Sequence, residues 1–181
     1  YFKKNFLILY FQIINDNLKI MNPTIDDIIK SIQEGSLRNL TLNHQSFAPE
    51  ELREICVALK DSSAITGIYL LGAAIDDDRT EIIADMLKEN SAIQILDATK
   101  NTIGDRGAAA LAEALKTNRT LKRLILRDNQ IGDAGAAALA AMLEESHALE
   151  VFSLGGNCIH EAGGLRIGRA LYRNRGLTML H

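Results

Sequence analysis

One apolar position recurs at a fixed interval of 28 residues through most of the chain, and this interval constrains the fold more than any other sequence feature. The residues at that position are Leu37, Ile65, Ile93, Leu121, Leu149 and Leu177. A period of this length is typical of a solenoid, in which each structural unit buries its apolar face against its neighbours. The sequence therefore predicts five complete stacked units over residues 37–176, with a sixth unit beginning at residue 177.

Two different apolar spacings occur inside each unit. Positions 4 and 6 alternate as in a β-strand with one buried face, and they hold Leu40/Leu42, Ile68/Leu70, Leu96/Ala98, Leu124/Leu126 and Phe152/Leu154. Positions 19 and 23 have the spacing of one helix face, and they hold Ile55/Leu59, Ile83/Leu87, Leu111/Leu115, Leu139/Leu143 and Ile167/Leu171. Each unit is thus predicted to be a short strand, a turn and a helix around one shared interior.

The residues between strand and helix suit a tight connection. The sequence Ile-Gly-Asp-x-Gly occupies residues 103–107 and 131–135 and places Asp105 and Asp133 where a helix N-cap is expected. Position 9 of three units holds asparagine, at Asn101, Asn129 and Asn157. We predict that these asparagine side chains satisfy backbone groups between neighbouring units.

The pattern LxxLxLxxNxIGDxGAxALAxxL, clearest in the third and fourth units, resembles the leucine-rich repeats of the ribonuclease inhibitor class. Repeats of this class also occur in NOD-like receptors, Ran GTPase-activating proteins, tropomodulin and small bacterial effector proteins. The resemblance implies an α/β fold, a leucine-rich repeat solenoid in the form of a horseshoe arc. Its parallel sheet is expected on the concave side and its helices on the convex side.

The two ends of the chain differ from the repeats. Residues 1–20 contain no Ala, Gly, Pro, Arg or Val, and Met21 follows them directly. We interpret them as a non-native extension, with translation starting at Met21, or as a poorly ordered tail. Residues 21–36 are predicted to form an N-terminal capping helix, because Thr24 and Asp27 have the spacing of a capping box. Residues 37–181 then hold five full repeats and a sixth strand, whose edge is free or pairs with another chain.

Composition argues against several function classes. The net charge is -3, with 20 Lys+Arg against 23 Asp+Glu, so we expect no broad basic surface for nucleic acid or anionic lipid. The apolar run at residues 6–14 is shorter than the roughly 20 residues of a membrane-spanning helix. Cys56 and Cys158 make neither a disulfide framework nor a zinc ligand set, which favours a reducing, cytoplasmic location.

We find no set of residues that predicts catalysis or cofactor binding. The four histidines, His44, His147, His160 and His181, occupy different positions of different units. Cys158 and His160 are close in sequence, but no third residue is present to orient such a nucleophile pair. The run Asp76–Asp78 lacks the glycine and distal glutamate of a calcium loop and is better placed to stabilise a helix N-terminus. We therefore predict no enzyme activity, no cofactor and no bound metal.

Strand positions 3, 5 and 7 should point away from the core, out of the concave sheet. Several of them are apolar, which is unusual for residues that face water: Tyr69, Leu71, Ile95, Ile125 and Val151. The same outward positions also hold three charged residues and two others: Asp97, Arg123, Arg127, Ser153 and Met179. An apolar stripe with a charged border, carrying Arg and Tyr, is typical of a protein-binding site. We predict that these ten residues contact a partner protein.

The resulting functional hypothesis is a non-catalytic module that binds a protein in its concave face. Resemblance to ribonuclease inhibitor suggests that the partner is an enzyme that the module inhibits or regulates. Resemblance to bacterial effectors suggests secretion into the cytosol of a host cell, with a host protein or another effector as the target. Two alternatives stay open: a GTPase-activating protein of the Ran type and an actin-capping structural protein of the tropomodulin type.

Overall fold

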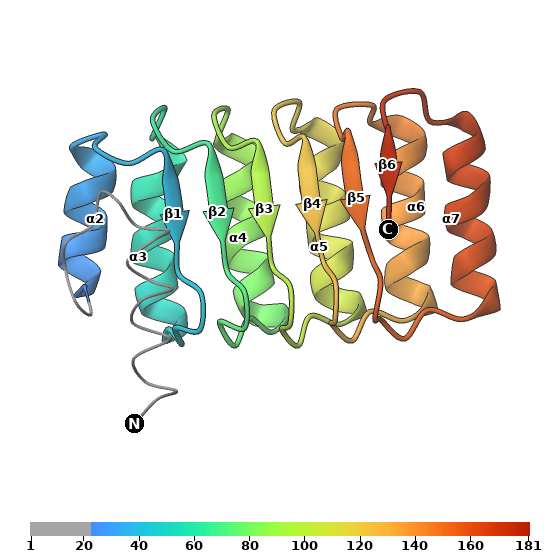
Figure 1. The fold of residues 1–181 in the computed structure, drawn as a ribbon, viewed down its shortest axis with the longest axis horizontal. Helices are drawn as coiled ribbons and strands as arrows, with labels where there is room; N and C mark the ends of the chain where they lie inside the picture. Colours follow the sequence, from blue (N-terminus) through green and yellow to red (C-terminus); the bar gives the residue numbers. More distant parts are fainter. Residues whose placement is uncertain (1–22) are drawn as a thin grey trace, which may run out of the picture.

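The computed structural model describes residues 23–181, in which helices and strands alternate along the chain (Figure 1). The helices are α2 (Ile25–Gln33), α3 (Pro49–Lys60), α4 (Asp77–Glu89), α5 (Asp105–Thr117), α6 (Asp133–Glu145) and α7 (Glu161–Arg173). The strands are β1 (Asn39–Thr41), β2 (Gly67–Tyr69), β3 (Ile95–Asp97), β4 (Arg123–Ile125), β5 (Val151–Ser153) and β6 (Met179–Leu180). This order confirms the predicted strand, turn and helix of each unit.

All strands pair in parallel and in sequence order, as β1-β2-β3-β4-β5-β6. Each pair joins residues that occupy the same position of neighbouring units, for example Leu96 with Leu124 and Leu124 with Phe152. Because the sequence period equals the structural period, the register needs no bulge or shift anywhere in the sheet. Side chains at one unit position therefore form a straight row across the strands.

The helices form a second layer that packs on one face of the sheet (Figure 1). Neighbouring strands lie about 4.8 Å apart, whereas packed helices lie about 8–10 Å apart. The row of helices is therefore longer than the row of strands, as Figure 1 shows from α2 to α7. The molecule bends with its sheet on the concave side, which is the leucine-rich repeat solenoid expected from the sequence.

The core lies between the two layers and consists of the residues at the predicted inward positions. Leu96, Leu124 and Phe152 from the strands and Leu111 and Leu139 from the helices are at most 1% exposed. Strands of three residues bury little surface alone, so each unit depends on the neighbours that cover its sides. Ala108 and Ala136 are fully buried where α5 and α6 pack together, because their small side chains let the helices approach closely.

Helix α2 covers the N-terminal side of the first repeat. The Thr24 hydroxyl accepts a hydrogen bond from the Asp27 N–H at 3.2 Å, and the Thr24 N–H donates to the Asp27 carboxylate at 3.0 Å. These bonds are the capping box that the sequence spacing indicates. The Thr24 hydroxyl also donates to the Asp27 carboxylate at 2.8 Å, and this bond, together with the bond from the Thr24 N–H, holds the pKa of Asp27 below its usual value. Ile28 and Ile32 from the same helix are buried in the core. The predicted extension at residues 1–20 lies outside the described residues.

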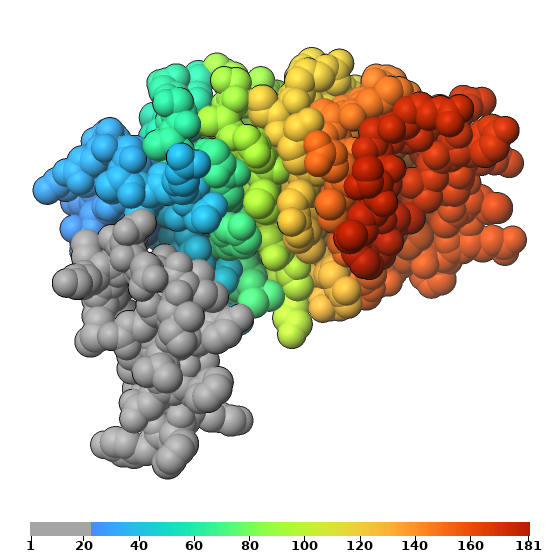
Figure 2. Space-filling model, turned by 45° about the horizontal axis from the view of Figure 1, so that its top comes forward, coloured from blue at the N-terminus to red at the C-terminus, as the bar shows by residue number. Residues whose placement is uncertain are grey.

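The C-terminal end of the sheet, at β6, is less covered than the N-terminal end. Met179 and Leu180 of β6 are 48% and 41% exposed, and the last residues, red in Figure 2, lie at the surface. Leu180 occupies the inward position that is fully buried in the fourth and fifth units at Leu124 and Phe152. In residues 23–181, no helix combines the length and the apolar character that a membrane crossing requires.

Candidate protein-binding site

Asparagines at position 9 fix the strand ends that carry the predicted site. The side-chain amide of Asn129 donates to the carbonyl oxygens of Ala98 at 3.0 Å and Leu126 at 3.2 Å. Its Oδ1 accepts from the Ile103 N–H at 3.0 Å, which joins the third and fourth units. Asn101 and Asn157 make the same three types of bond. The predicted role of these asparagines is confirmed.

A second set of asparagines, at position 26 beyond the helix ends, was not predicted from the sequence. The side-chain amide of Asn118 donates to the Leu87 carbonyl at 2.7 Å, and its Oδ1 accepts from the Thr120 and Leu121 N–H groups at 2.9 Å each. Asn90 and Asn174 make equivalent bonds. The 28-residue spacing of Asn90 and Asn118 is a signal that can reveal this set, although Ser146 interrupts it in the fourth unit.

The predicted N-cap role of Asp105 and Asp133 is wrong, because the N-caps of α5 and α6 are Gly104 and Gly132. Each aspartate is the first residue of its helix and reaches sideways to the next unit. The carboxylate of Asp105 accepts from the N–H groups of Gly132 and Gly135, both at 2.7 Å. Parallel neighbouring helices make this possible, because the free N–H groups at each helix start lie beside the preceding helix.

The same bonds recur along the row of helix starts. Asp77 accepts from Gly104 and Gly107, and Asp133 accepts from His160 and Gly163. Asp77 is the first aspartate of this row. Hydrogen bonding to helix N–H groups therefore gives Asp77 a structural role in the acidic run 76–78, and no metal is needed to explain it. In that run, Asp76 caps its own helix by accepting from the Arg79 N–H at 2.9 Å.

Replacing Asp105 by alanine is expected to lower the free energy of unfolding by about 1 kcal/mol, because the first N–H groups of α6 lose their acceptor. Urea denaturation followed by circular dichroism measures this difference. Glu161→Ala is the matched control, because Glu161 also begins a helix but accepts no such bond within residues 23–181. Equal losses in the two variants would show that Asp105 acts through the helix dipole alone.

The residues predicted to face a partner form two continuous rows on the concave sheet. In the first row, direct strand partners are Ile95, Arg123, Val151 and Met179. In the second row, direct partners are Tyr69, Asp97, Ile125 and Ser153. Leu71 and Arg127 lie just beyond the ends of β2 and β4, at the rim of the same face. The structure thus places all ten predicted residues on one side of the sheet.

The alternation of burial is sharpest in β4. Leu124 is fully buried, whereas its neighbours Arg123 and Ile125 are exposed and partly exposed. Ile125 therefore points away from the core although it is apolar. In the free protein part of its side chain contacts water, which is the condition that a binding residue must meet.

Charged and apolar residues alternate within these rows, where the sequence suggested an apolar stripe with a charged border. Arg123 lies between Ile95 and Val151 in its row, and Asp97 lies between Tyr69 and Ile125 in the other. The strand register determines which side chains are neighbours in a row, and the register brings each charged residue between two apolar ones. A partner that fits this face must present both charges together with apolar side chains.

One member of the predicted set, Ser153, is buried, and another, Met179, lies at the open end of the sheet. Ser153 is only 3% exposed, and its hydroxyl has no hydrogen-bond partner in the described part of the chain. Met179 at the open side of the sheet is 48% exposed. Ser153 is therefore brought into the row but offers little surface to a partner, while Met179 extends the apolar face toward the open side.

The two cysteines have different surroundings. Burial raises the pKa of the Cys56 thiol to about 12, so this cysteine stays protonated and is a poor nucleophile. Cys158 is exposed, and within residues 23–181 it forms no hydrogen bond with His160. The side chains of residues 23–181 make no group of acidic residues, histidines and cysteines that would hold a metal ion.

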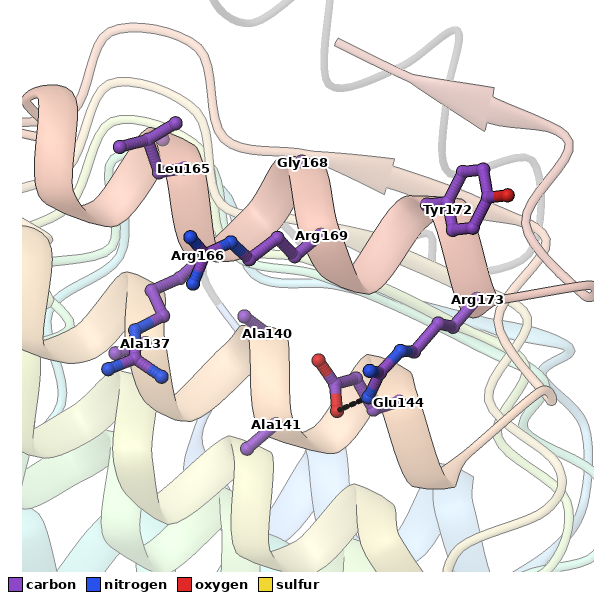
Figure 3. Close-up of a pocket in the computed structure, with 11 residues that line it drawn as sticks. Ala137, Ala140, Ala141, Glu144, Leu165, Arg166, Gly168, Arg169, Tyr172 and Arg173 are labelled. Atoms are coloured by element: carbon purple, nitrogen blue, oxygen red, sulfur yellow. Dashed lines mark hydrogen bonds and ion pairs between the residues drawn. The ribbon is translucent and has the colours of Figure 1, made fainter.

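A groove on the convex face is a second candidate that sequence reasoning missed. It has a volume of about 860 Å³ and lies between α6 and α7 (Figure 3). Arg166, Arg169 and Arg173 line it from α7, while α6 contributes a floor of alanines. The signal in the sequence is a local departure from the repeat, since arginine and glycine replace residues that are alanine in the two preceding helices.

Known proteins resemble this chain in sequence pattern and in fold. The family model of the TMOD/LMOD (tropomodulin and leiomodin) leucine-rich domain matches residues 21–176. A solved structure described as leiomodin-1 actin-binding site 2 has a TM-score of 0.69 and 24% sequence identity, and the alignment covers 85% of this chain and 91% of that chain. The tropomodulin C-terminal domain of Caenorhabditis elegans has a TM-score of 0.64 and 17% identity over 84% of this chain and 93% of that chain.

At these identities the two solved structures establish a shared fold. No match was found among curated proteins. The matched family segment contains α2 and every complete repeat, so it includes the convex groove and both concave rows except Met179 of β6.

Proposed function

The chain belongs to the tropomodulin/leiomodin leucine-rich domain family, and from this membership we propose that it is a non-catalytic module that binds actin through its concave face. The match over residues 21–176 is the observation that carries the proposal. It is supported by the similar structure described as an actin-binding site of leiomodin-1. Family membership favours the tropomodulin-type alternative over an inhibitor of the ribonuclease inhibitor type.

The concave face is the surface that best supports protein binding. Its apolar side chains are partly exposed in the free protein, so their burial by a partner releases water from apolar surface. Arg123 and Asp97 stand among them and select a partner with complementary charges.

The size of the face limits how the partner binds. Strands β2 to β5 span about 15 Å, and three residues along a strand span about 10 Å. This footprint is far smaller than the roughly 800 Å² per partner of a stable protein interface. The partner must therefore also contact the rim, where Leu71 and Arg127 lie, and the turns beyond it.

The other hypotheses of the sequence gain no support from the family match. An effector secreted by a bacterium into a host cell is set aside in favour of an actin-associated, cytoplasmic protein of the tropomodulin type. A GTPase-activating protein of the Ran type differs in one measurable respect, since adding the chain to a GTPase would accelerate GTP hydrolysis. Association of β6 with the edge strand of another chain is a secondary mode, favoured by the exposure of Met179 and Leu180.

The double substitution Ile95→Glu/Ile125→Glu is expected to weaken binding to actin by at least about tenfold, or about 1.4 kcal/mol, because it places carboxylates in the centre of the concave face. Folding should change little, since both side chains are partly exposed in the free protein. The effect is measured as the change in affinity for actin monomers and in co-sedimentation with actin filaments, relative to the unmodified chain.

Ala109→Glu/Ala134→Glu is the matched control, with the same added charge on exposed convex positions of α5 and α6. The control variant should bind as the unmodified chain does. Failure of the unmodified chain to bind actin in any form would refute the proposed partner. Equal binding by all three proteins would keep actin as the partner but reject the concave face.

A further inference from the structure

The convex groove has a basic wall and an apolar floor. Arg166 and Arg173 extend from α7 toward α6, where Arg166 ends beside Ala137 and Arg173 lies against Glu144 (Figure 3). Arg173 forms an ion pair with Glu144 at 3.3 Å. Arg166 and Arg169 have no carboxylate within 4.0 Å among residues 23–181. The groove thus contains positive charge that no carboxylate of residues 23–181 pairs with.

The neighbouring convex helices show that this is a local feature. The cations of α4 and α5 are all paired with carboxylates of their own or an adjacent helix: Arg79 with Asp76, Lys88 with Asp85, Arg106 with Asp78 and Lys116 with Glu113. In α6 the outward positions that hold Glu81 and Asp85 in α4 are alanines, Ala137 and Ala141. The carboxylates that would pair with Arg166 and Arg169 are therefore missing from the side of the groove that faces them.

We propose that the groove between α6 and α7 binds an amphipathic α-helix of a partner protein, which supplies the missing carboxylates and covers the alanine floor. The arginines at 166, 169 and 173 follow one another at three and four residues, so they form one ridge about 10 Å long. A helix that runs antiparallel to α7 matches this ridge when its acidic residues are spaced i, i+4 and i+7. Its apolar residues then lie on Ala137 and Ala141.

The shape of the groove favours a helix over other ligands. The molecule curves across its helices, but the groove runs straight along α6 and α7, each of which has 13 residues. A straight groove between two helices fits a rod of similar length, which is the helix-in-groove mode of peptide recognition. Leu165 and Tyr172 point from α7 away from α6 (Figure 3), so the surface of the groove itself is formed by the arginines and the alanines. This surface is opposite the concave face, so the inference is independent of the actin proposal.

A synthetic peptide tests the inference with the full chain. The probe is a helical peptide of about four turns, with leucines on one face and glutamates at i, i+4 and i+7 beside them. Calorimetry or fluorescence anisotropy is expected to give a dissociation constant on the order of 10–100 μM that rises with salt. The matched control peptide carries lysine in place of each glutamate and is expected not to bind.

Substitutions in the protein test whether the glutamate peptide binds in the groove between α6 and α7. Arg166→Glu/Arg169→Glu should weaken binding of the glutamate peptide at least about tenfold and should create binding of the lysine peptide. Lys88→Glu/Lys116→Glu, with the same change of charge on α4 and α5, should leave the affinity unchanged. Binding of both peptides to the unmodified chain, equal loss in both variants, or no binding at millimolar peptide would overturn the proposal. Binding to phosphatidylserine vesicles without binding to the peptide would overturn it in favour of a lipid surface.

Discussion

Replacing Leu124 by alanine is expected to lower the free energy of unfolding by about 2–5 kcal/mol, because the change leaves a cavity in the middle of the core. Leu124 is 0% exposed and lies in the register between Leu96 and Phe152, which are equally buried. A solenoid unit has no other contacts than its neighbours, so the cavity weakens the interfaces on both sides of β4. Urea denaturation monitored by circular dichroism measures the loss.

The adjacent substitution Ile125→Ala is the matched control for this prediction. Ile125 differs from Leu124 by one strand position and is only partly buried, so its truncation should cost less than about 1 kcal/mol. A larger loss for Ile125→Ala than for Leu124→Ala would mean that the strand faces the core with the opposite side. The concave rows would then be wrong in their entirety.

Replacing Asn118 by alanine is the second large effect, with an expected loss of about 2–3 kcal/mol. Asn118 is 6% exposed, and its side chain satisfies the Leu87 carbonyl and the N–H groups of Thr120 and Leu121. Alanine leaves these groups buried without partners, which costs more than the bonds themselves contributed. The same denaturation experiment measures the loss.

Asn118→Ser provides the control for this second effect. Serine occupies the same position naturally at Ser146, where it is 1% exposed, so a serine hydroxyl fits the site. The Asn118→Ser variant should lose less stability than Asn118→Ala, because the hydroxyl retains part of the bonding. If the two variants unfold at the same urea concentration, the amide bonds across units contribute little to stability.

The repeat period made most of the fold predictable. A constant interval of 28 residues sets both the strand register and the row in which each outward side chain lies, as the pairing of Ile95 with Arg123 and Val151 illustrates. The position 9 asparagines were predictable because they recur with the period of 28 residues in the turn after each strand. The period does not indicate whether a side chain at a helix end bonds within its own unit or to a neighbouring unit.

The incorrect and missing predictions have two causes: the direction of a side chain at a helix end, and differences between units. Asp105 was assigned to its own helix because a local cap is the common pattern, whereas its carboxylate bonds to residues 27 and 30 positions later. Asn118 bonds to Leu87, 31 positions earlier. The groove was missed because it depends on differences between units, arginine in α7 facing alanine in α6, rather than on what the units have in common. The burial of Ser153 likewise distinguishes one unit from the others.

Site-directed crosslinking is the most direct test of the central claim that actin binds the concave face. A cysteine is introduced at Ile125 on the concave sheet or at Ala109 on the convex helix α5, each in a Cys158→Ser background; buried Cys56 stays unreactive because its pKa is near 12. With a short thiol-reactive crosslinker, we expect a covalent product with actin from position 125 and none from position 109. A product from position 109 alone, or from neither position under conditions in which actin binds, would contradict the claim.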